Sequence, residues 1–277
     1  MPIMHHTQLS EDHLAGNGGL GRYVLLPGDP ARAALLAAQL HRVERVENPR
    51  GHTAYLGRLG VGPGVDVLVT HSGMGTGSTE VILHELLEVG ARRVLRVGSC
   101  GAMVEGVRPG GVVIVTGAVR DEATTSHYAP PGFPALAAPD CVAAMTEGAR
   151  RAGLAEHTWR GLCHTKASLW AREFGHGPNG AANLDYKHWL ARCGVIASEM
   201  EAAAIFVMCH TRRPAPVAPV AGGSRAVHAQ GGAVLAVYAD ATSDMELSPA
   251  VIDQANQRAA AVALHGLVAW AEADGVG

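Results

Sequence analysis

Residues 94–102 have the sequence Val94-Leu95-Arg96-Val97-Gly98-Ser99-Cys100-Gly101-Ala102. The apolar run predicts a buried β-strand, and the glycines and serine that follow it predict a turn. Such a turn presents backbone N–H groups and the Ser99 hydroxyl to an anion, and Arg96 supplies a positive charge. The stretch therefore indicates half of an anion-binding site, and the other half has to come from elsewhere in the chain.

A second unit of this kind lies near the N-terminus. Residues 23–26 predict a buried strand, 27–30 a turn and 31–40 a helix, so that a helix N-terminus beside Arg32 offers a further anion site. Periodicity also predicts helices at 79–89, 137–153, 198–208 and 249–272, and strands at 52–59, 65–70, 110–116, 158–165, 193–197 and 233–239. This alternation predicts a three-layer α/β/α single domain over residues 1–277, with a mixed central sheet and the site at the ends of its strands.

Three segments fall outside the alternation. Residues 1–20 are polar and glycine-rich, and they predict a poorly ordered N-terminal arm or an edge element that a neighbouring subunit would fix. Residues 166–190 carry aromatic side chains and predict an irregular pocket wall or lid. Residues 211–232 are rich in Pro, Gly and Ala and predict an exposed insertion.

The composition favours small-molecule chemistry. The 277 residues are 48% hydrophobic and 17% charged, with 22 Lys and Arg against 25 Asp and Glu. The net charge of −3 leaves no basic field that would hold nucleic acid or an anionic membrane. Five cysteines without CxxC spacing predict reduced thiols and a cytoplasmic location. No metal-ligand spacing is evident, and the apolar runs are shorter than the ~18 residues of a membrane span.

Polar residues at the two predicted turns form a candidate phosphate pocket. Gly28, Arg32, Arg96 and Ser99 belong to it, because a planar guanidinium binds phosphate through two hydrogen bonds. Arg50 is a third loop arginine, which an ordinary surface ion pair explains equally well.

Two carboxylates, Glu199 and Glu201, stand at the start of an apolar helix. Either they complement the helix dipole, or Glu201 grips the vicinal hydroxyls of a sugar. Asp240 follows the last predicted strand, where it either caps a turn or takes part in the chemistry.

Three of these stretches resemble the signature motifs of one enzyme family. They are Leu26-Pro27-Gly28-Asp29-Pro30-Ala31-Arg32, Leu95-Arg96-Val97-Gly98-Ser99-Cys100-Gly101 and Ser198-Glu199-Met200-Glu201-Ala202-Ala203. In this order they resemble the nucleoside phosphorylase-I family, which includes bacterial uridine phosphorylases and hexameric purine nucleoside phosphorylases. The resemblance spans residues 6–270. It implies a nucleoside-phosphorylase-like fold and phosphorolysis, in which a nucleoside and orthophosphate give a free base and ribose 1-phosphate.

The resemblance also implies roles for the candidate residues. Phosphate would be bound by Gly28, Arg32, Arg50, Arg96 and Ser99, ribose by His6, Met200 and Glu201, and the base by Cys100, Gly101, Trp170, Glu199 and Asp240. Arg96 and Asp240 would be catalytic, since the phosphate dianion stabilises positive charge on the sugar and the leaving base needs a proton. Arg50 and His6 would act across a dimer interface, in a hexamer built as a trimer of dimers. Orthophosphate is a co-substrate, and no cofactor is implied.

The resemblance gives conflicting indications of which base the substrate carries. The segment 166–198 and the loop 126–130 look like those of uridine phosphorylases, but residues 171–174 replace the Gln and Arg that grip uracil there. Asp240 is similar to the aspartate with which the purine enzymes protonate N7, although Asp253 stands where those enzymes place a helper arginine. A purine nucleoside (inosine, adenosine or guanosine) is therefore slightly favoured over uridine as substrate. Two further alternatives stay open: a nucleosidase that uses water, and a nucleoside-binding protein that has lost turnover.

Overall fold

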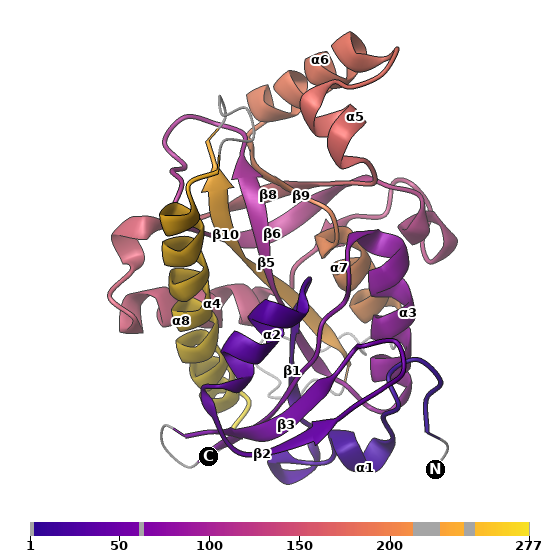
Figure 1. The fold of residues 1–277 in the computed structure, drawn as a ribbon, viewed down its shortest axis with the longest axis vertical. Helices are drawn as coiled ribbons and strands as arrows, with labels where there is room; N and C mark the ends of the chain where they lie inside the picture. Colours follow the sequence, from indigo (N-terminus) through magenta and orange to yellow (C-terminus); the bar gives the residue numbers. More distant parts are fainter. Residues whose placement is uncertain (1–2, 61–63, 213–227, 241–246, 277) are drawn as a thin grey trace, which may run out of the picture.

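The computed structural model describes residues 3–60, 64–212, 228–240 and 247–276, and within them ten strands form one sheet with helices on both faces (Figure 1). The strands are β1 (Tyr23–Pro27), β2 (Leu40–Val46), β3 (Ala54–Leu59), β4 (Val65–Val69), β5 (Arg93–Ala102), β6 (Val112–Asp121), β7 (Ala135–Leu136), β8 (Thr158–Lys166), β9 (Val195–Glu199) and β10 (Gln230–Ala239). The helices are α1 (Glu11–Leu14), α2 (Pro30–Ala37), α3 (Gly75–Glu88), α4 (Pro139–Arg151), α5 (Leu169–Phe174), α6 (Gly180–Arg192), α7 (Ala202–Arg212) and α8 (Pro249–Ala273).

The sheet is mixed and partly closed. Its strand order is β10-β6-β8-β9-β5-β1-β4-β3-β2, and β10 also pairs in parallel with β5. Strands β5, β10, β6, β8 and β9 therefore form a closed ring, while β1, β4, β3 and β2 extend from it as an open sheet. The three-layer architecture with a mixed sheet that the sequence predicts is confirmed, whereas the closure is not foreseen by any pattern in the sequence.

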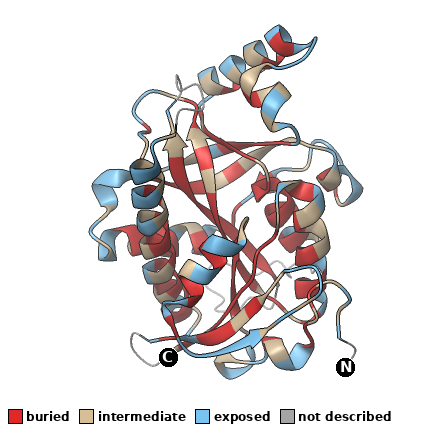
Figure 2. Cartoon of the chain, in the orientation of Figure 1, coloured by how far each residue is buried: buried red, intermediate tan, exposed pale blue. Residues whose placement is uncertain are grey.

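Alternate residues of the central strands point into two separate cores. Val94 of β5 packs in the core that contains α3 and α7, whereas Leu95 and Val97 pack in the core that contains α2, α4 and α8. This follows from the two-residue period of a strand, which sends neighbouring side chains to opposite faces. Figure 2 shows buried strands between helices whose outer faces are exposed. Helix α7 is the exception, because its residues from Ala202 to Cys209 are all buried.

The structure corrects the predicted turn after β5. The segment 98–101 continues the strand, since it pairs with β10 and then with β9. Its two glycines do not break the strand, because Gly98 pairs with β10 and Gly101 pairs with both β10 and β9. The hydroxyl of Ser99 thus projects from a strand rather than from an anion-binding turn.

The three segments expected to be irregular are more regular than predicted. In the N-terminal arm Leu9 and Leu14 are buried, and Glu85 accepts hydrogen bonds from two backbone N–H groups of the arm, so the chain itself holds the arm. The segment 166–190 contains helices α5 and α6 and stands over the ends of the ring strands (Figure 1). Of the predicted insertion, 213–227 lies outside the described residues, and the prediction is wrong for residues 230–232, which belong to buried strand β10. Strand β2, exposed along most of its length, is an element that the sequence does not predict.

Candidate active site

A cavity of about 420 Å³ lies where β1, β5, β8, β9 and β10 end, beneath α5 and α6. Ten predicted site residues line it: Gly28, Arg32, Arg96, Ser99, Cys100, Gly101, Glu199, Met200, Glu201 and Asp240. They come from segments more than 200 positions apart in the sequence, which the sheet topology brings together.

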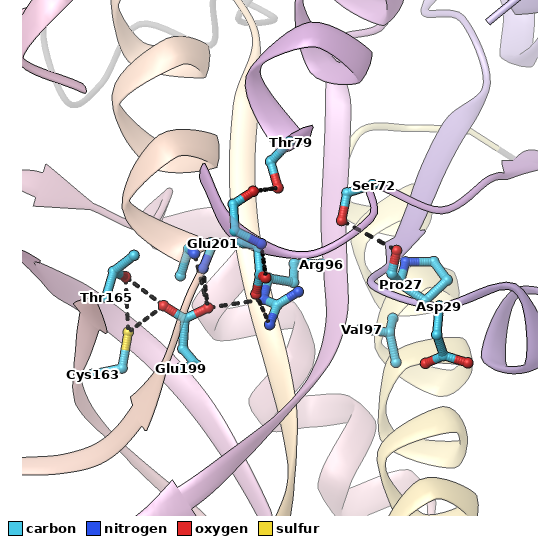
Figure 3. A network of polar contacts seen from close by, with 12 residues as sticks. Pro27, Asp29, Ser72, Thr79, Arg96, Val97, Cys163, Thr165, Glu199 and Glu201 are labelled. Carbon is cyan, nitrogen blue, oxygen red and sulfur yellow. Dashed lines mark hydrogen bonds and ion pairs between the residues drawn. The ribbon is translucent and has the colours of Figure 1, made fainter. Parts of the chain in front are cut away.

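Arg96 lies at the centre of the site, clamped between two carboxylates (Figure 3). Its Nε donates to Glu199 Oε2 at 3.0 Å, and its NH2 lies 2.5 Å from Glu201 Oε2. Burial alone would lower the pKa of Arg96, but the two carboxylates outweigh burial and raise it. The guanidinium folds back over Gly98, where a Cβ would lie 2.5 Å from Cζ of Arg96. Glycine at 98 is therefore required by the path of the arginine, which the motif alone does not reveal.

The remaining nitrogen of this guanidinium is the clearest sign of a ligand. NH1 of Arg96 is buried and has no hydrogen-bond partner among the described residues. It faces the backbone turn after β1, 3.8 Å from where a Cβ on Gly28 would stand. A buried charged donor left unpaired is costly, so an anion bound beside Gly28 would satisfy it.

Arg32, on the same side of the cavity, is held by four groups. Its NH1 lies 3.3 Å from Asp29 Oδ2 and donates to the carbonyl oxygen of Val97 at 3.3 Å. Its NH2 donates to the Tyr238 hydroxyl at 2.6 Å and to Asn256 Oδ1 at 3.2 Å. Asp29 also caps α2 by accepting from the backbone N–H of Arg32 at 2.8 Å. Tyr238 and Asn256 are positioning residues that no motif reveals, because they come from β10 and α8.

The two glutamates of the third motif have different surroundings. Glu199 accepts hydrogen bonds from Arg96, from the hydroxyl of Thr165, from the thiol of Cys163 and from the backbone N–H groups of residues 201 and 202. These five donors use its acceptor capacity, so Glu199 orients Arg96 and the start of α7 and has no lone pair left for a base.

Glu201 accepts from the backbone N–H of Gly75 at 2.5 Å as well as from Arg96. Burial raises its pKa, Arg96 opposes that rise, and the nearby Glu199 adds to it. Met200, between the two glutamates, is partly buried and lines the cavity. Glu201 thus keeps open acceptor capacity at the cavity, whereas Glu199 has none left.

The other end of the cavity carries charged groups that the sequence motifs do not include. Glu173 of α5 lies 2.9 Å from Lys166 Nζ and 2.6 Å from Lys187 Nζ, and it accepts a hydrogen bond from the Ser198 hydroxyl at 2.6 Å. Burial would raise the pKa of Glu173, but the two ammonium groups and these hydrogen bonds lower it to about 2. A lone glutamate in a segment expected to be irregular gives no sequence signal, because its partners come from β8, β9 and α6.

Three predicted site residues lie outside this cavity. Trp170 is half exposed and packs beside Phe174, which lines the cavity in its place. His6 is held at the surface by Glu85, with Nδ1 2.6 Å from Oε1. Arg50 is exposed in the turn before β3, where its backbone N–H donates to Asn48. Within one chain the structure therefore does not bring these three to the site.

The comparisons with known proteins agree with this geometry. A model of the "Phosphorylase superfamily" matches residues 22–269. The chain belongs to this superfamily. It is 37% identical over 196 residues to a uridine phosphorylase of Treponema pallidum, covering 70% of this chain and 74% of the relative. It is 29% identical to the uridine phosphorylase of Escherichia coli, over 74% and 79% of the two chains. It is also 31% identical to a DeoD-type purine nucleoside phosphorylase of Mannheimia succiniciproducens, over 69% and 76%.

The chain is accordingly an enzyme of the nucleoside phosphorylase type, a pentosyltransferase whose substrates are a nucleoside and phosphate. In the described part of the chain, no cluster of His, Cys, Asp and Glu is arranged to hold a metal ion. The helices described are also too short or too polar to cross a membrane.

Proposed function

We propose that this phosphorylase cleaves uridine, giving uracil and ribose 1-phosphate. The observation that carries phosphorolysis is the unpaired, buried NH1 of Arg96 beside Gly28, with Arg32 on the same side of the cavity. Uridine is preferred over a purine nucleoside because most of the similar relatives reported above are named for uridine.

In the proposed reaction, a phosphate oxygen attacks C1′ of the ribose while the bond from C1′ to the base breaks. The electron pair of that bond leaves with the base. Arg96 and Arg32 hold the phosphate at the end of the cavity near Gly28, and Glu201 accepts from the ribose hydroxyls. Since positive charge develops on the sugar, the phosphate and Glu201 stabilise the transition state electrostatically.

The purine alternative depends on Asp240 as a proton donor to the base. Asp240 lines the cavity, but it is exposed to solvent. Asp253, at the position where a helper arginine would stand, accepts a hydrogen bond from Gln257 one turn along α8. An exposed Asp240, together with a carboxylate where the helper arginine would stand, does not favour the purine alternative.

The test is a comparison of uridine, inosine and adenosine, each with and without phosphate. We expect uridine to have the highest kcat/KM, ribose 1-phosphate to be the product, and cleavage to stop without phosphate. Faster cleavage of inosine would refute the uridine assignment, and full activity in phosphate-free buffer would refute phosphorolysis. The variant Asp240→Ala should keep its activity on uridine.

We also propose that Arg50 and His6 serve the site of a neighbouring subunit, because both lie outside the cavity of their own chain. Arg50→Ala and Arg32→Ala should each abolish activity when expressed alone. Co-expression of the two variants should restore activity, since one site of each mixed dimer then carries neither substitution. A mixture that stays inactive would place Arg50 in its own chain's site.

A further inference from the structure

The base end of the cavity has a charged surface of unusual composition. Lys166 ends β8, Glu173 lies on α5 and Lys187 lies on α6, and all three line the same cavity as Arg96. The neighbouring Arg172 takes no part, because it is paired with Asp121 at 2.7 Å and stacks on a tyrosine ring. We name Lys166, Glu173 and Lys187 the base-end triad.

Ion pairs and hydrogen bonds hold the three side chains of the triad in place, with the carboxylate between the two ammonium groups. Lys166 Nζ lies 2.9 Å from Glu173 Oε2, and Lys187 Nζ lies 2.6 Å from Oε1 of the same carboxylate. Ser198 donates to Oε2 at 2.6 Å and accepts from Lys166 at 2.7 Å, which fixes both groups against β9. The carboxylate thus sits between two ammonium groups, one at each of its oxygens.

Each member of the triad has capacity left for a ligand. A carboxylate offers about four lone-pair sites, and the contacts within the described residues use three of those of Glu173. An ammonium group has three donors. Lys166 uses two on Ser198 and Glu173, and Lys187 uses two on the carboxylate and the backbone carbonyl of Glu173. One donor, one acceptor and one donor therefore remain, in that order.

We propose that the base-end triad recognises the imide edge of the base, with Lys166 and Lys187 donating to its two carbonyl oxygens and Glu173 accepting the N–H between them. Uracil presents this edge as O2, N3–H and O4, and xanthine presents the same pattern. Three other bases do not: hypoxanthine lacks one carbonyl, cytosine lacks one carbonyl and the N–H, and adenine lacks all three groups. The inference rests on the proposed uridine activity and assigns the residues that select the base.

The charge state of the triad strengthens this selection. With its pKa lowered to about 2, Glu173 is ionised at neutral pH and can only accept hydrogen bonds. A base without an N–H at this position leaves the carboxylate unsatisfied and places an acceptor or a methyl group against it. Sites built to hydrogen-bond a substrate reject analogues that lack the partner group by factors of about 10⁴.

The first experiment compares uridine with 3-methyluridine, which lacks the N–H. We expect the wild-type enzyme to favour uridine by about 100-fold or more in kcat/KM. Calorimetric binding of uracil and of 3-methyluracil, each with ribose 1-phosphate, repeats the comparison without turnover. Equal kcat/KM for uridine and 3-methyluridine, or equal affinity for uracil and 3-methyluracil, would overturn the proposal.

The second experiment repeats the comparison with Glu173→Gln, in which an amide can donate as well as accept. The preference for uridine over 3-methyluridine should fall by about 10-fold or more, because the specific acceptor is lost. A purely structural role of Glu173 would lower both rates together and leave the ratio unchanged, which would refute the triad. Asp185→Asn is the matched control, since this exposed carboxylate lies on α6 outside the cavity and its change should leave the ratio as in the wild type.

Xanthosine separates failure of the triad from failure of the uridine assignment. An enzyme that ignores uridine but cleaves xanthosine about 10-fold better than inosine would refute the uridine assignment and support the triad. An enzyme that cleaves uridine with the same 3-methyluridine ratio in wild type and Glu173→Gln would support the uridine assignment and refute the triad.

Discussion

Replacing Gly98 by alanine tests whether the path of Arg96 controls activity. A Cβ at position 98 would lie 2.5 Å from Cζ of Arg96 and 2.6 Å from its NH2, closer than real Cβ atoms approach other atoms. A free arginine would swing aside at little cost. This one is clamped by Glu199 at 3.0 Å and by Glu201 at 2.5 Å, so the displacement breaks at least one of these contacts.

The expected loss in the free energy of unfolding follows from those contacts. A hydrogen bond to a charged group is worth about 1.5–3 kcal/mol, and overpacking a buried site costs about 1–3 kcal/mol. We therefore expect Gly98→Ala to lower the free energy of unfolding by about 1–3 kcal/mol. We expect kcat of Gly98→Ala to be about 10²–10³-fold below that of the wild type, because displacing one preorganised donor has an effect of this size.

The assay is phosphate-dependent cleavage of uridine, with kcat and the KM for phosphate measured separately, and urea unfolding for stability. Gly77→Ala is the control, since Gly77 lies exposed on α3 and a Cβ there would meet no atom within 4 Å. Wild-type kcat/KM in Gly98→Ala would refute the reasoning, because it would mean that activity does not depend on where the guanidinium lies.

Three further predictions follow from groups around the site. Thr165→Val removes a hydroxyl that donates to Glu199 and accepts from a backbone N–H of α7, so urea unfolding should show a loss of about 1–3 kcal/mol. Iodoacetamide followed by mass spectrometry should label exposed Cys193 first and leave Cys100 unmodified in the folded enzyme, since burial raises the pKa of the Cys100 thiol. Lowering the pKa of Glu173 from 4.5 to about 2 stabilises the fold by about 3 kcal/mol above pH 5, and this contribution is lost as the pH falls towards 2. Urea unfolding from pH 6 to pH 3 should therefore show the difference between wild type and Glu173→Gln shrinking, and a constant difference would contradict the assignment.

The sequence predicts most of the layers and the motif residues because both depend on local patterns. Alternating apolar runs with turn residues place β1, β5 and β10 and the helices between them, and side chains from three motifs meet at one cavity. Arg96 is recognisable because a charged residue inside an apolar strand needs a partner. The sequence cannot show that both of its partners come from one later motif.

The features that sequence analysis misses depend on contacts between distant segments. Closure of the ring through β10 and β5 is a pairing choice that no strand pattern records. Helix α5 has only six residues, and its ends depend on local caps at Ser168 and Gly175. Helix α6 buries only Gly180, Asn183 and Leu190, so it carries no apolar stripe for a sequence pattern to detect. The base-end triad is assembled from β8, α5 and α6, and although all three members lie in the predicted pocket-wall segment, no periodicity or motif shows that they meet.

The formal charges along the cavity vary in the direction that the proposed reaction requires. Around the phosphate and the sugar, Arg96 and Arg32 are outnumbered by the carboxylates of Glu199, Glu201 and Asp29. A phosphate bound there therefore keeps much of its negative charge beside the developing positive charge of the ribose. At the other end, the two lysines of the triad outnumber Glu173. A positive base end stabilises the electron pair that the leaving uracil takes with it, and the same lysines donate to the carbonyl oxygens over which that charge spreads. Base selection and leaving-group stabilisation thus depend on the same three side chains, and loss of the triad should lower kcat for uridine as well as the preference for an imide.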